Sequence, residues 1–344
     1  MMPWTFKALC SRDFREELTC LKRIKKVSFR SIKAVVRGVA PVLRNAKHFA
    51  KELKKINLND ADIYVYSYWI NGLVLKTATL LPKAKVIKKV ARAHRYDLYD
   101  EVRSAGYIPL KEKVINDIDE LYLISEDGLE YVKNKHKENE EKYRLSYLGT
   151  KDYGLGPGIN QEKALKIASC SFVIPVKRIE KIIGALSLVN EVAVEWTHFG
   201  GGQDLEKMKK LAEEKLGTKD NIDYKFYGYI KNAELMKYYK ENRVDLFVNV
   251  SKHEGLPVSI MEAMSFGISI IATDVGSTRE TIEEGVNGYL LSEEFEDEIL
   301  AERIISYGKM SESRKKELSD SSRKIWENKF CASNNYGEFM KGLQ

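Results

Sequence analysis

The chain has 344 residues, which exceeds the usual size of a single domain, so we expect two domains. Apolar residues make up 44% and charged residues 31%, a balance that is typical of a globular protein in water and excludes a disordered chain or a membrane-spanning bundle. The longest apolar stretch, residues 63–81, is interrupted by Asn71 and Lys76. It therefore predicts a buried strand followed by a helix rather than a membrane span.

The net charge of +7 is concentrated at one end of the chain. The first sixty residues carry about fifteen Lys or Arg against about five Asp or Glu. Two interpretations remain open, solvated helical faces or an anionic membrane surface as partner. No nucleic-acid-binding motif accompanies the charge, so we do not expect a nucleic acid as partner.

The four cysteines are widely scattered and show no C-x-x-C spacing. We therefore expect reduced thiols and a cytoplasmic location. The first thirty residues are charged where a secretory signal needs an apolar run, so no signal peptide is predicted.

The first half of the chain predicts an α/β domain with an irregular beginning. Residues 1–58 predict basic amphipathic helices and no strand. Strands are predicted within residues 60–69 and 84–94, and residues 120–136 predict a strand that turns into a helix with Ser125 as its N-cap.

From residue 164 onward, short β-rich runs alternate with helical patterns, which predicts a parallel sheet covered by helices on both faces. The predicted strands lie within residues 165–174, 192–199, 223–228, 245–251 and 269–274, and the predicted helices within 178–189, 204–216, 232–242 and 257–266. The expected organisation is a first domain at 1–150, a glycine-rich linker at 151–163, a second domain at 164–325 and a C-terminal helix at 326–344 that returns to the first domain.

The run HEGLPVSIMEAMSFG, residues 253–267, carries the strongest functional signal. A buried strand ends near Ser251, and Pro257 stands where a helix should begin. Ligands bind at the carboxyl edge of an open parallel sheet, and the free N–H groups of a first helical turn favour a phosphate. Gly255 allows a ligand to approach the backbone closely.

Glu262 stands in an otherwise apolar helical run, about five residues and roughly 7.5 Å beyond the helix start. A carboxylate among apolar neighbours needs hydrogen-bond donors, and the two hydroxyls of a ribose supply them. A nearby lysine or backbone amide would supply them equally well, and the residues alone leave both partners open.

Taken together, Glu254 and Glu262 resemble the E-x7-E motif of the family 4 retaining glycosyltransferases, which have the GT-B fold. The similarity continues through residues 267–291, and the segments at residues 92–101, 124–128 and 175–186 resemble the subset that assembles bacterial exopolysaccharide, lipopolysaccharide and colanic acid. The resemblance implies two Rossmann-like domains that face a cleft, here with a shortened N-terminal domain that lacks the family's opening strand and glycine-rich turn.

The resemblance also implies roles for individual residues. Lys177 would neutralise the leaving phosphate, Glu254 would face the hydroxyls of the donor sugar, and His94 would meet the sugar from the first domain. The residues expected to bind the donor are Arg178, Gly201, Gly255, Leu256 and Glu262, and those expected on the acceptor side are Arg92 and Asp97, of which Asp97 could alternatively orient the imidazole of His94.

Neither a catalytic nucleophile nor a bound metal is expected, because in this family the departing phosphate accepts the proton of the acceptor and cationic side chains do the work of a metal. No cofactor is expected. One departure from the family is Ser171, which stands where most members have a phosphate-binding arginine. We expect Arg178 to compensate, or the affinity for diphosphate to be reduced.

The expected function is transfer of a sugar, with retention of configuration, from a UDP- or GDP-sugar to a saccharide acceptor, lipid-linked by resemblance, in cell-surface polysaccharide biosynthesis. The basic first domain suits a peripheral enzyme at the inner face of the cell membrane. Two alternatives remain. One is a catalytically impaired sugar-nucleotide-binding or scaffold protein, and the other is a GT-B nucleotide-sugar epimerase.

Overall fold

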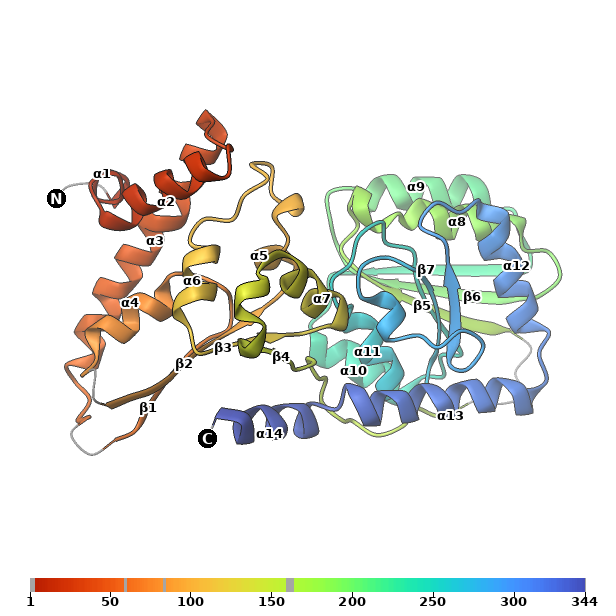
Figure 1. Cartoon of the computed structure of the whole chain (residues 1–344). Helices are drawn as coiled ribbons and strands as arrows, with labels where there is room; N and C mark the ends of the chain where they lie inside the picture. The colour runs from red at the N-terminus through yellow and green to blue at the C-terminus, as the bar shows by residue number, and fades with distance from the viewer. Residues whose placement is uncertain (1–3, 59–60, 83–84, 159–163, 344) are drawn as a thin grey trace. The chain divides into compact units, whose positions relative to one another are not determined.

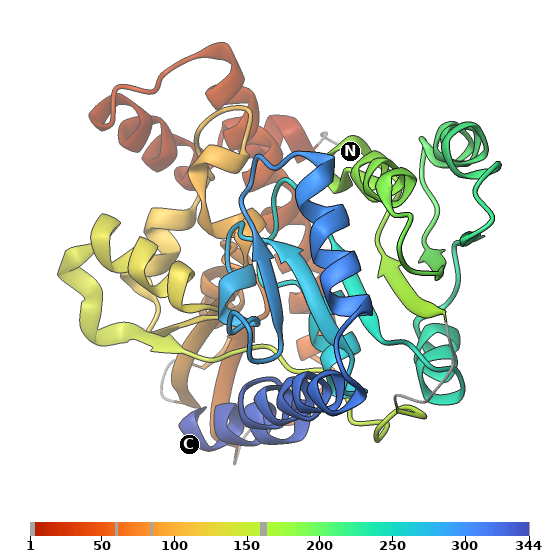
Figure 2. The ribbon, with the colours of Figure 1, turned by 90° about the vertical axis from the view of Figure 1, so that its right-hand side faces the viewer.

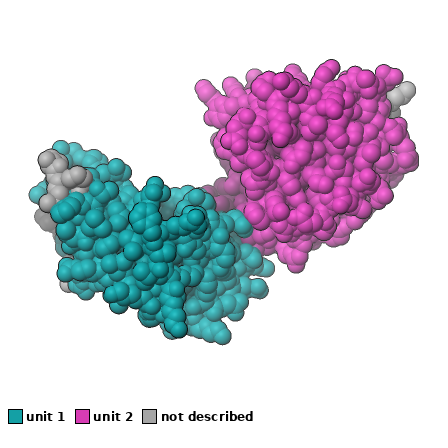
Figure 3. Space-filling model, turned by 90° about the horizontal axis from the view of Figure 1, so that it is seen from above, with its two compact units in different colours: residues 1–146, 341–344 teal, residues 147–340 magenta. Residues whose placement is uncertain are grey.

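The computed structural model describes residues 4–58, 61–82, 85–158 and 164–343. The chain divides into two compact units, one that runs to Ser146 and includes residues 341–344, and one formed by residues 147–340 (Figure 3). The division falls close to residue 150, where the sequence suggests the end of the first domain. As far as it is described, the expected linker at 151–163 belongs to the second unit, and its residues 159–163 lie outside the described ranges.

The first unit begins with three helices, as the amphipathic pattern predicts. They are α1 (Trp4–Leu9), α2 (Arg12–Arg23) and α3 (Phe29–Leu53). Their apolar faces form a small core of their own, in which Leu21 and Val35 are fully buried. Residues 4–58 contain no strand, so this end of the unit is helical throughout.

A parallel sheet of four strands follows, in the order β1-β2-β3-β4 (Figure 1). The strands are β1 (Ile63–Ser67), β2 (Val86–Ala93), β3 (Glu120–Leu123) and β4 (Tyr143–Leu145). The connections contain α4 (Leu73–Leu80), α5 (Arg95–Leu98), η2 (Asp100–Val102), α6 (Lys111–Asp117), α7 (Glu126–Lys135) and η3 (Lys137–Lys142). Because all four strands are parallel, their carboxyl ends share one edge of the sheet.

The predicted N-cap of α7 is confirmed, because the Ser125 hydroxyl accepts the Gly128 N–H at 3.1 Å. At the other end of the chain, the last residues of the C-terminal helix group with the first unit. There the Lys88 ammonium donates to the Gly342 carbonyl at 2.9 Å.

The second unit is built on six parallel strands in the order β10-β9-β8-β5-β6-β7. They are β5 (Leu165–Cys170), β6 (Val194–Phe199), β7 (Ile222–Gly228), β8 (Leu246–Asn249), β9 (Ser269–Thr273) and β10 (Gly288–Leu291). Strands β5 to β7 run outward on one side, and β8 to β10 run outward on the other. This is the strand order of a doubly wound, Rossmann-like sheet, as the sequence predicts.

Helices cover both faces of this sheet (Figures 1 and 2). One layer contains α8 (Ile179–Leu188), α9 (Leu205–Leu216) and α12 (Asp297–Gly308). The other contains α10 (Asn232–Glu241), α11 (Val258–Ser265) and α13 (Glu312–Lys329), after which α14 (Ala332–Leu343) ends the chain. The short η4 (Pro175–Lys177) and η5 (Thr278–Glu280) lie in the loops after β5 and β9.

The core of the second unit lies between the sheet and the helices, with Ile167, Trp196 and Ile271 almost or fully buried. Strands β8 and β9 are buried along their whole length, which explains their continuous apolar sequences. Among the described residues, none of the helices combines the length and the apolar character that crossing a bilayer requires.

Candidate functional site at the carboxyl edge of the second sheet

The strand order places a topological switch point between β5 and β8. These strands are neighbours in the sheet, but the chain leaves them toward opposite edges. The loops after two such strands part from one another and leave a crevice at the carboxyl edge of the sheet, which is where open α/β sheets bind their ligands. Lys177 follows β5 and Glu254 follows β8, so the sequence-predicted residues lie at the switch point.

Lys177 and Glu254 form an ion pair, with Nζ and Oε1 2.5 Å apart. The amide of Asn249 donates to the same carboxylate oxygen at 3.2 Å. The Lys177 and Glu254 side chains are 20% and 14% exposed, so the pair is largely shielded yet still reachable by a ligand. A partly buried pair of this kind holds both charges in fixed positions.

Arg178 differs from its neighbour, because its guanidinium is directed into the protein and is only 8% exposed. Its Nε donates to the Val250 carbonyl at 2.7 Å, its Nη1 to the Glu293 carbonyl at 2.7 Å, and its Nη2 lies 3.4 Å from the Ser251 carbonyl. The expectation that Arg178 binds the donor and compensates for Ser171 stays a prediction. Its donors hold the loops after β5, β8 and β10 together.

A backbone hydrogen bond supports the same junction, because the Lys252 N–H donates to the Val176 carbonyl at 2.8 Å. Arg178 itself has a positive φ of 50°, which is uncommon for a residue with a side chain and places α8 immediately after Lys177. The two loops are thereby joined by main chain and side chain alike, and Lys177 is presented at the rim of the junction.

Glu262 lies in the middle of α11, among buried apolar neighbours on the same helix. The Asn232 amide donates to its Oε1 at 2.7 Å. Burial raises the pKa of the Glu262 carboxyl above its usual value, and the Asn232 hydrogen bond opposes that shift. Because Asn232 is the one hydrogen-bond partner of this carboxylate among the described residues, the carboxylate retains acceptor capacity for a ligand.

Cys170, the last residue of β5, connects the two halves of this site. Burial raises the pKa of its thiol to about 12. The charges of Glu262 and Lys177 also act on it, the first raising and the second lowering that pKa. Both charged side chains are therefore close enough to Cys170 to influence its titration, which places Glu262 and the ion pair in one neighbourhood.

Gly255 and Leu256 form the approach to α11. Pro257 is the N-cap of the helix, and the Leu256 side chain is buried, so the side chain itself is turned away from solvent. The Gly255 carbonyl accepts the Ser277 N–H at 3.3 Å, which ties this loop to the loop after β9.

The turn after β6 contains three glycines, Gly200 to Gly202, and close packing explains why two of these positions are glycine. A Cβ on Gly200 would collide with the carbonyl oxygen of Ser171, and one on Gly202 would collide with that of Val173. A Cβ on Gly201 would meet Tyr229 at an ordinary contact distance of 3.4 Å. Close packing against the loop after β5 thus requires glycine on either side of Gly201, while Gly201 itself has room for a small side chain.

In the first unit, His94 follows β2 and packs in a cluster with two aromatic rings that also contact each other. Its ring centroid is 4.5 Å from that of Tyr68 and 4.3 Å from that of Trp69. Neither ring nitrogen has a hydrogen-bond partner among the described residues. Burial lowers the pKa of His94 to about 4, and the charge of Arg92 acts in the same direction. His94 is therefore a neutral imidazole at physiological pH.

Arg92 and Asp97, the two residues expected on the acceptor side, both form hydrogen bonds with other residues of the first unit. Arg92 is fully buried and donates to the Ser146 hydroxyl at 2.9 Å, so it offers no surface to an acceptor. Asp97 accepts the backbone N–H of His94 at 2.7 Å and that of Ile70. Asp97 thus fixes the main chain around His94 and does not orient its imidazole, which corrects both expectations.

Sequence reasoning missed the two asparagines of this site. Asn249 donates to Glu254, and Asn232 donates to Glu262. Asn249 is the last residue of β8, five residues before Glu254, so its place at the strand end was a usable signal. Asn232 is 30 residues from Glu262 in the sequence, and no local pattern indicates that contact. Within the described ranges, no group of three or more His, Cys, Asp or Glu side chains is arranged to hold a metal ion.

Comparison with known proteins agrees with this geometry. Residues 158–324 match the family described as "Glycosyl transferases group 1". The poly(glycerol-phosphate) alpha-glucosyltransferase of Bacillus subtilis is 30% identical over 215 residues, which are 61% of this chain and 30% of that protein. The O-antigen biosynthesis glycosyltransferase WbnH of Escherichia coli is 40% identical over 100 residues, 29% of this chain and 25% of that protein. The chain thus spans less than a third of the length of these curated relatives.

The structural comparison concerns the fold as a whole. A Staphylococcus aureus TarM mutant, crystallised with Fondaparinux, alpha-GlcNAc-glycerol and UDP, superposes with a TM-score of 0.67 at 19% identity, over 87% of this chain and 59% of that one. The fold of this chain is therefore the GT-B type, with two Rossmann-like units, as the sequence predicts.

Proposed function

We propose that this protein is a glycosyltransferase that moves a sugar from a UDP- or GDP-sugar to a saccharide acceptor in the biosynthesis of a cell-surface polysaccharide. The observation that carries the proposal is the Lys177–Glu254 ion pair at the switch point of the second sheet, with Glu262 on the helix that begins there. The family match over residues 158–324 and the relatives in poly(glycerol-phosphate) glucosylation and O-antigen synthesis support it.

The donor is held at two points in this proposal. Glu262 accepts hydrogen bonds from the ribose hydroxyls with the acceptor capacity that Asn232 leaves available. The diphosphate lies between Lys177 and the backbone amides near Gly255 and Leu256. Binding of the phosphate separates Lys177 from Glu254, and the carboxylate then turns to the hydroxyls of the donor sugar.

The reaction keeps the configuration at the anomeric carbon. The bond between that carbon and the phosphate oxygen breaks, and the oxygen of the acceptor hydroxyl attacks from the same face. The proton of that hydroxyl passes to the departing phosphate. Lys177 stabilises the negative charge that develops on the phosphate, so the transfer proceeds without a metal ion.

His94 is the residue of the first unit to which this proposal gives a role. As a neutral imidazole it is able to donate or accept a hydrogen bond, and its ring nitrogens have no partner among the described residues. The proposed role is contact with the donor sugar, with Tyr68 and Trp69 holding the ring in place.

The acceptor in this proposal is lipid-linked, and the protein works at the inner face of the cell membrane. The excess of Lys and Arg in the first sixty residues supports this location.

The test is to incubate the protein with UDP- and GDP-sugars and to follow nucleoside diphosphate release, with and without a membrane-lipid extract. Release that depends on the extract is the expected result. Nucleotide binding without any release would favour a scaffold protein, whose case rests on Ser171 and on the internal use of Arg178. Conversion of the sugar nucleotide without the extract would favour an epimerase.

A further inference from the structure

A cavity in the first unit is lined by none of the residues of the proposed donor site. It has a volume of about 700 Å³, and one wall is the face of α3 that carries Arg30, Lys33 and Arg37. The opposite wall is the segment from Tyr96 to Pro109, which contributes Arg103. Four cationic side chains thus surround one hollow of the size that a phosphate-bearing headgroup fills.

These charges are not neutralised inside the unit. Within the described part of the chain, none of the four forms an ion pair with a carboxylate. The charge of Arg103 acts on the Asp97 carboxylate, but the two oxygens of that carboxylate accept the backbone N–H groups of His94 and Ile70. A concave surface lined by unpaired cations attracts an anion, and the planar guanidinium of arginine matches the geometry of a phosphate.

The walls of the cavity are held rigidly. A Cβ on Gly38 would come within 2.8 Å of the Pro109 ring, so α3 packs closely on the far wall at that point. The Arg103 guanidinium lies 3.6 Å from the centroid of the Tyr96 ring, which holds it in a stacked position. A preformed cavity binds its ligand with a smaller loss of conformational entropy.

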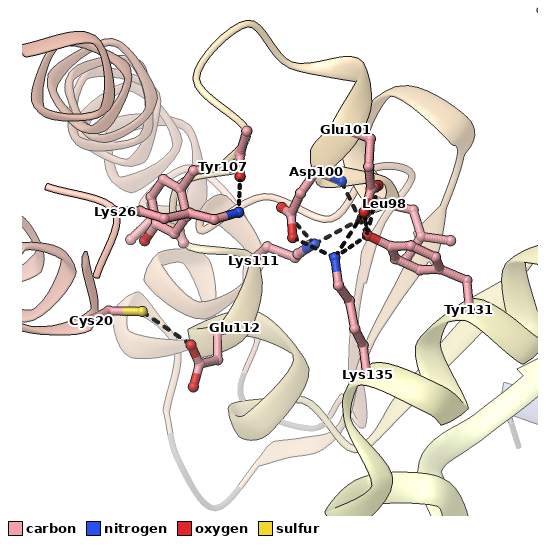
Figure 4. A network of polar contacts seen from close by, with 12 residues as sticks. Cys20, Lys26, Leu98, Asp100, Glu101, Tyr107, Lys111, Glu112, Tyr131 and Lys135 are labelled. Carbon is pink, nitrogen blue, oxygen red and sulfur yellow. Dashed lines mark hydrogen bonds and ion pairs between the residues drawn. The ribbon is translucent and has the colours of Figure 1, made fainter. Parts of the chain in front are cut away.

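A polar network behind the second wall adds to this rigidity (Figure 4). Lys111 bonds to the Leu98 carbonyl and pairs with Asp100, each at 2.8 Å. Lys135 joins the same network through Asp100 at 3.0 Å and the Tyr131 hydroxyl at 2.6 Å. The segment that carries Tyr96 and Arg103 is thereby anchored to α6 and α7.

An apolar tip lies at the turn between α2 and α3 (Figure 1), next in the sequence to Arg30 of the cavity wall. Phe29 is 81% exposed, and Val27 and Ile24 are 50% and 38% exposed. We call Ile24, Val27 and Phe29 the apolar tip. Basic residues flank it on both sides, namely Lys22, Arg23, Lys25, Lys26 and Arg30.

The tip is fixed in its exposed position. Ser28 and Ser31 form a reciprocal capping box at the start of α3, with distances of 2.8 and 3.1 Å. The Lys26 ammonium donates to the Gly106 carbonyl at 2.6 Å and so ties the turn to the far wall of the cavity (Figure 4). Phe29 therefore remains in water although it is one of the most apolar side chains, which calls for an apolar partner.

We propose that this face of the first unit docks on an anionic phospholipid bilayer, with the apolar tip entering the interface and the basic cavity receiving a lipid phosphate. Cations alone would suit any phosphate-bearing molecule. The exposed apolar residues at their centre select a lipid surface, because only a bilayer offers anionic headgroups and hydrocarbon at the same place. The proposal names the residues that would bind the membrane at the location given under the proposed function. It rests on the proposed function only for the biological role of that binding.

The cavity is also near the segment that carries His94, because Tyr96 in its wall is two residues further along the chain. A lipid-linked acceptor whose phosphate entered the cavity would thus be held close to that segment. The chemical class of ligand is a phosphate ester at a membrane surface.

The experiment measures co-sedimentation of the full-length protein with vesicles of phosphatidylcholine, with or without phosphatidylglycerol. We expect binding that requires phosphatidylglycerol and weakens with salt. Lys33→Ala with Arg37→Ala should weaken partitioning about 30-fold, and Phe29→Ser about tenfold. Each variant should keep the wild-type melting temperature, since all three side chains are exposed.

The matched controls are Lys51→Ala with Lys54→Ala, at the far end of the same helical region, and Ile299→Ser, an exposed apolar residue of the second unit. They should bind vesicles within about twofold of the wild type. Equal losses in controls and tip variants, or no dependence on phosphatidylglycerol, would overturn the proposal.

Inorganic polyphosphate serves as the soluble competitor. If it binds as tightly as the vesicles and Phe29→Ser leaves that affinity and vesicle binding unchanged, the cavity is a site for free phosphate and the membrane proposal is wrong. Nucleotide binding without vesicles should be the same in all these variants. Vesicle binding by a protein that fails to bind any sugar nucleotide would count against the proposed function and leave the membrane face intact.

Discussion

Glu262 is a carboxylate on a helix whose buried side chains are apolar except for Ser265, and its remaining acceptor capacity gives the first prediction. Glu262→Ala should weaken binding of a UDP- or GDP-sugar by roughly 10- to 100-fold, because hydrogen bonds to a charged group contribute about 1.5–3 kcal/mol each. Glu262→Gln keeps one acceptor oxygen and should lose less. Isothermal calorimetry measures both affinities, and an unchanged affinity in Glu262→Ala would remove this residue from the site.

Lys177 should affect turnover more than binding, since its charge matters most when the glycosidic bond breaks. Lys177→Ala is expected to lower kcat by roughly 100- to 1000-fold in the nucleoside diphosphate release assay. Lys181→Ala is a matched control, because Lys181 pairs with Asp297 at 3.1 Å and bonds to the Phe295 carbonyl. Equal rates for the two variants would contradict the role of Lys177.

His94 gives a prediction about pH. Its pKa is lowered from 6.5 to about 4, so the folded state favours the neutral ring. This contribution to the free energy of unfolding is complete above pH 6.5 and is lost as the pH falls through 4. Between pH 7 and 5, the wild type should therefore lose about 2 kcal/mol more stability than His94→Gln. Urea unfolding at both pH values measures the difference, and equal losses would mean that His94 titrates normally.

At the scale of the elements, the junction of the loops after β5, β8 and β10 depends on Arg178. Arg178→Lys keeps the charge but loses the planar fork that reaches the carbonyls of Val250 and Glu293. We expect the free energy of unfolding to fall by roughly 2–4 kcal/mol, because buried carbonyls lose their donors. Lys316→Ala, an exposed substitution on α13, should change it by less than about 0.5 kcal/mol. Denaturant titration of both variants checks this, and equal midpoints would show that the junction does not need the guanidinium.

The elements themselves were largely predictable. The strands β5 to β9 lie within their predicted runs to within a residue, and α7 begins at the predicted cap, because local periodicity and capping chemistry decide such features. The strand β4 was missed, since three residues are too few to show a period. It is recognisable only by its pairing with β3.

The roles of individual polar residues were harder to predict. The patterns around Glu254, Glu262 and Lys177 place these residues correctly near the carboxyl edge, because Lys177 and Glu254 follow strands and Glu262 lies on the helix that comes next. The internal contacts of Arg92 and Arg178 could not be predicted from the sequence. Their partners are 54 and 72 residues away in the sequence, and burial by such distant segments leaves no local signal.

At the scale of the whole molecule, the two units divide the proposed work. The second unit contains nearly all of the region that matches known glycosyltransferases, and it carries the proposed donor site. The first unit carries His94 and the basic cavity. Its opening helices carry the excess of positive charge noted in the sequence. Donor binding and membrane binding are thus proposed for separate units, so substitutions in one unit should leave the function of the other unchanged.

The ion pair between Lys177 and Glu254 has one more consequence. In the resting protein, the cation that would hold a phosphate already has an anion of its own. Under the proposed function, a phosphate that binds Lys177 leaves Glu254 with the Asn249 amide as donor, and the hydroxyls of a sugar supply further donors where bare diphosphate does not. We therefore expect the pair to favour a compound that carries both phosphate and carbohydrate over either one alone.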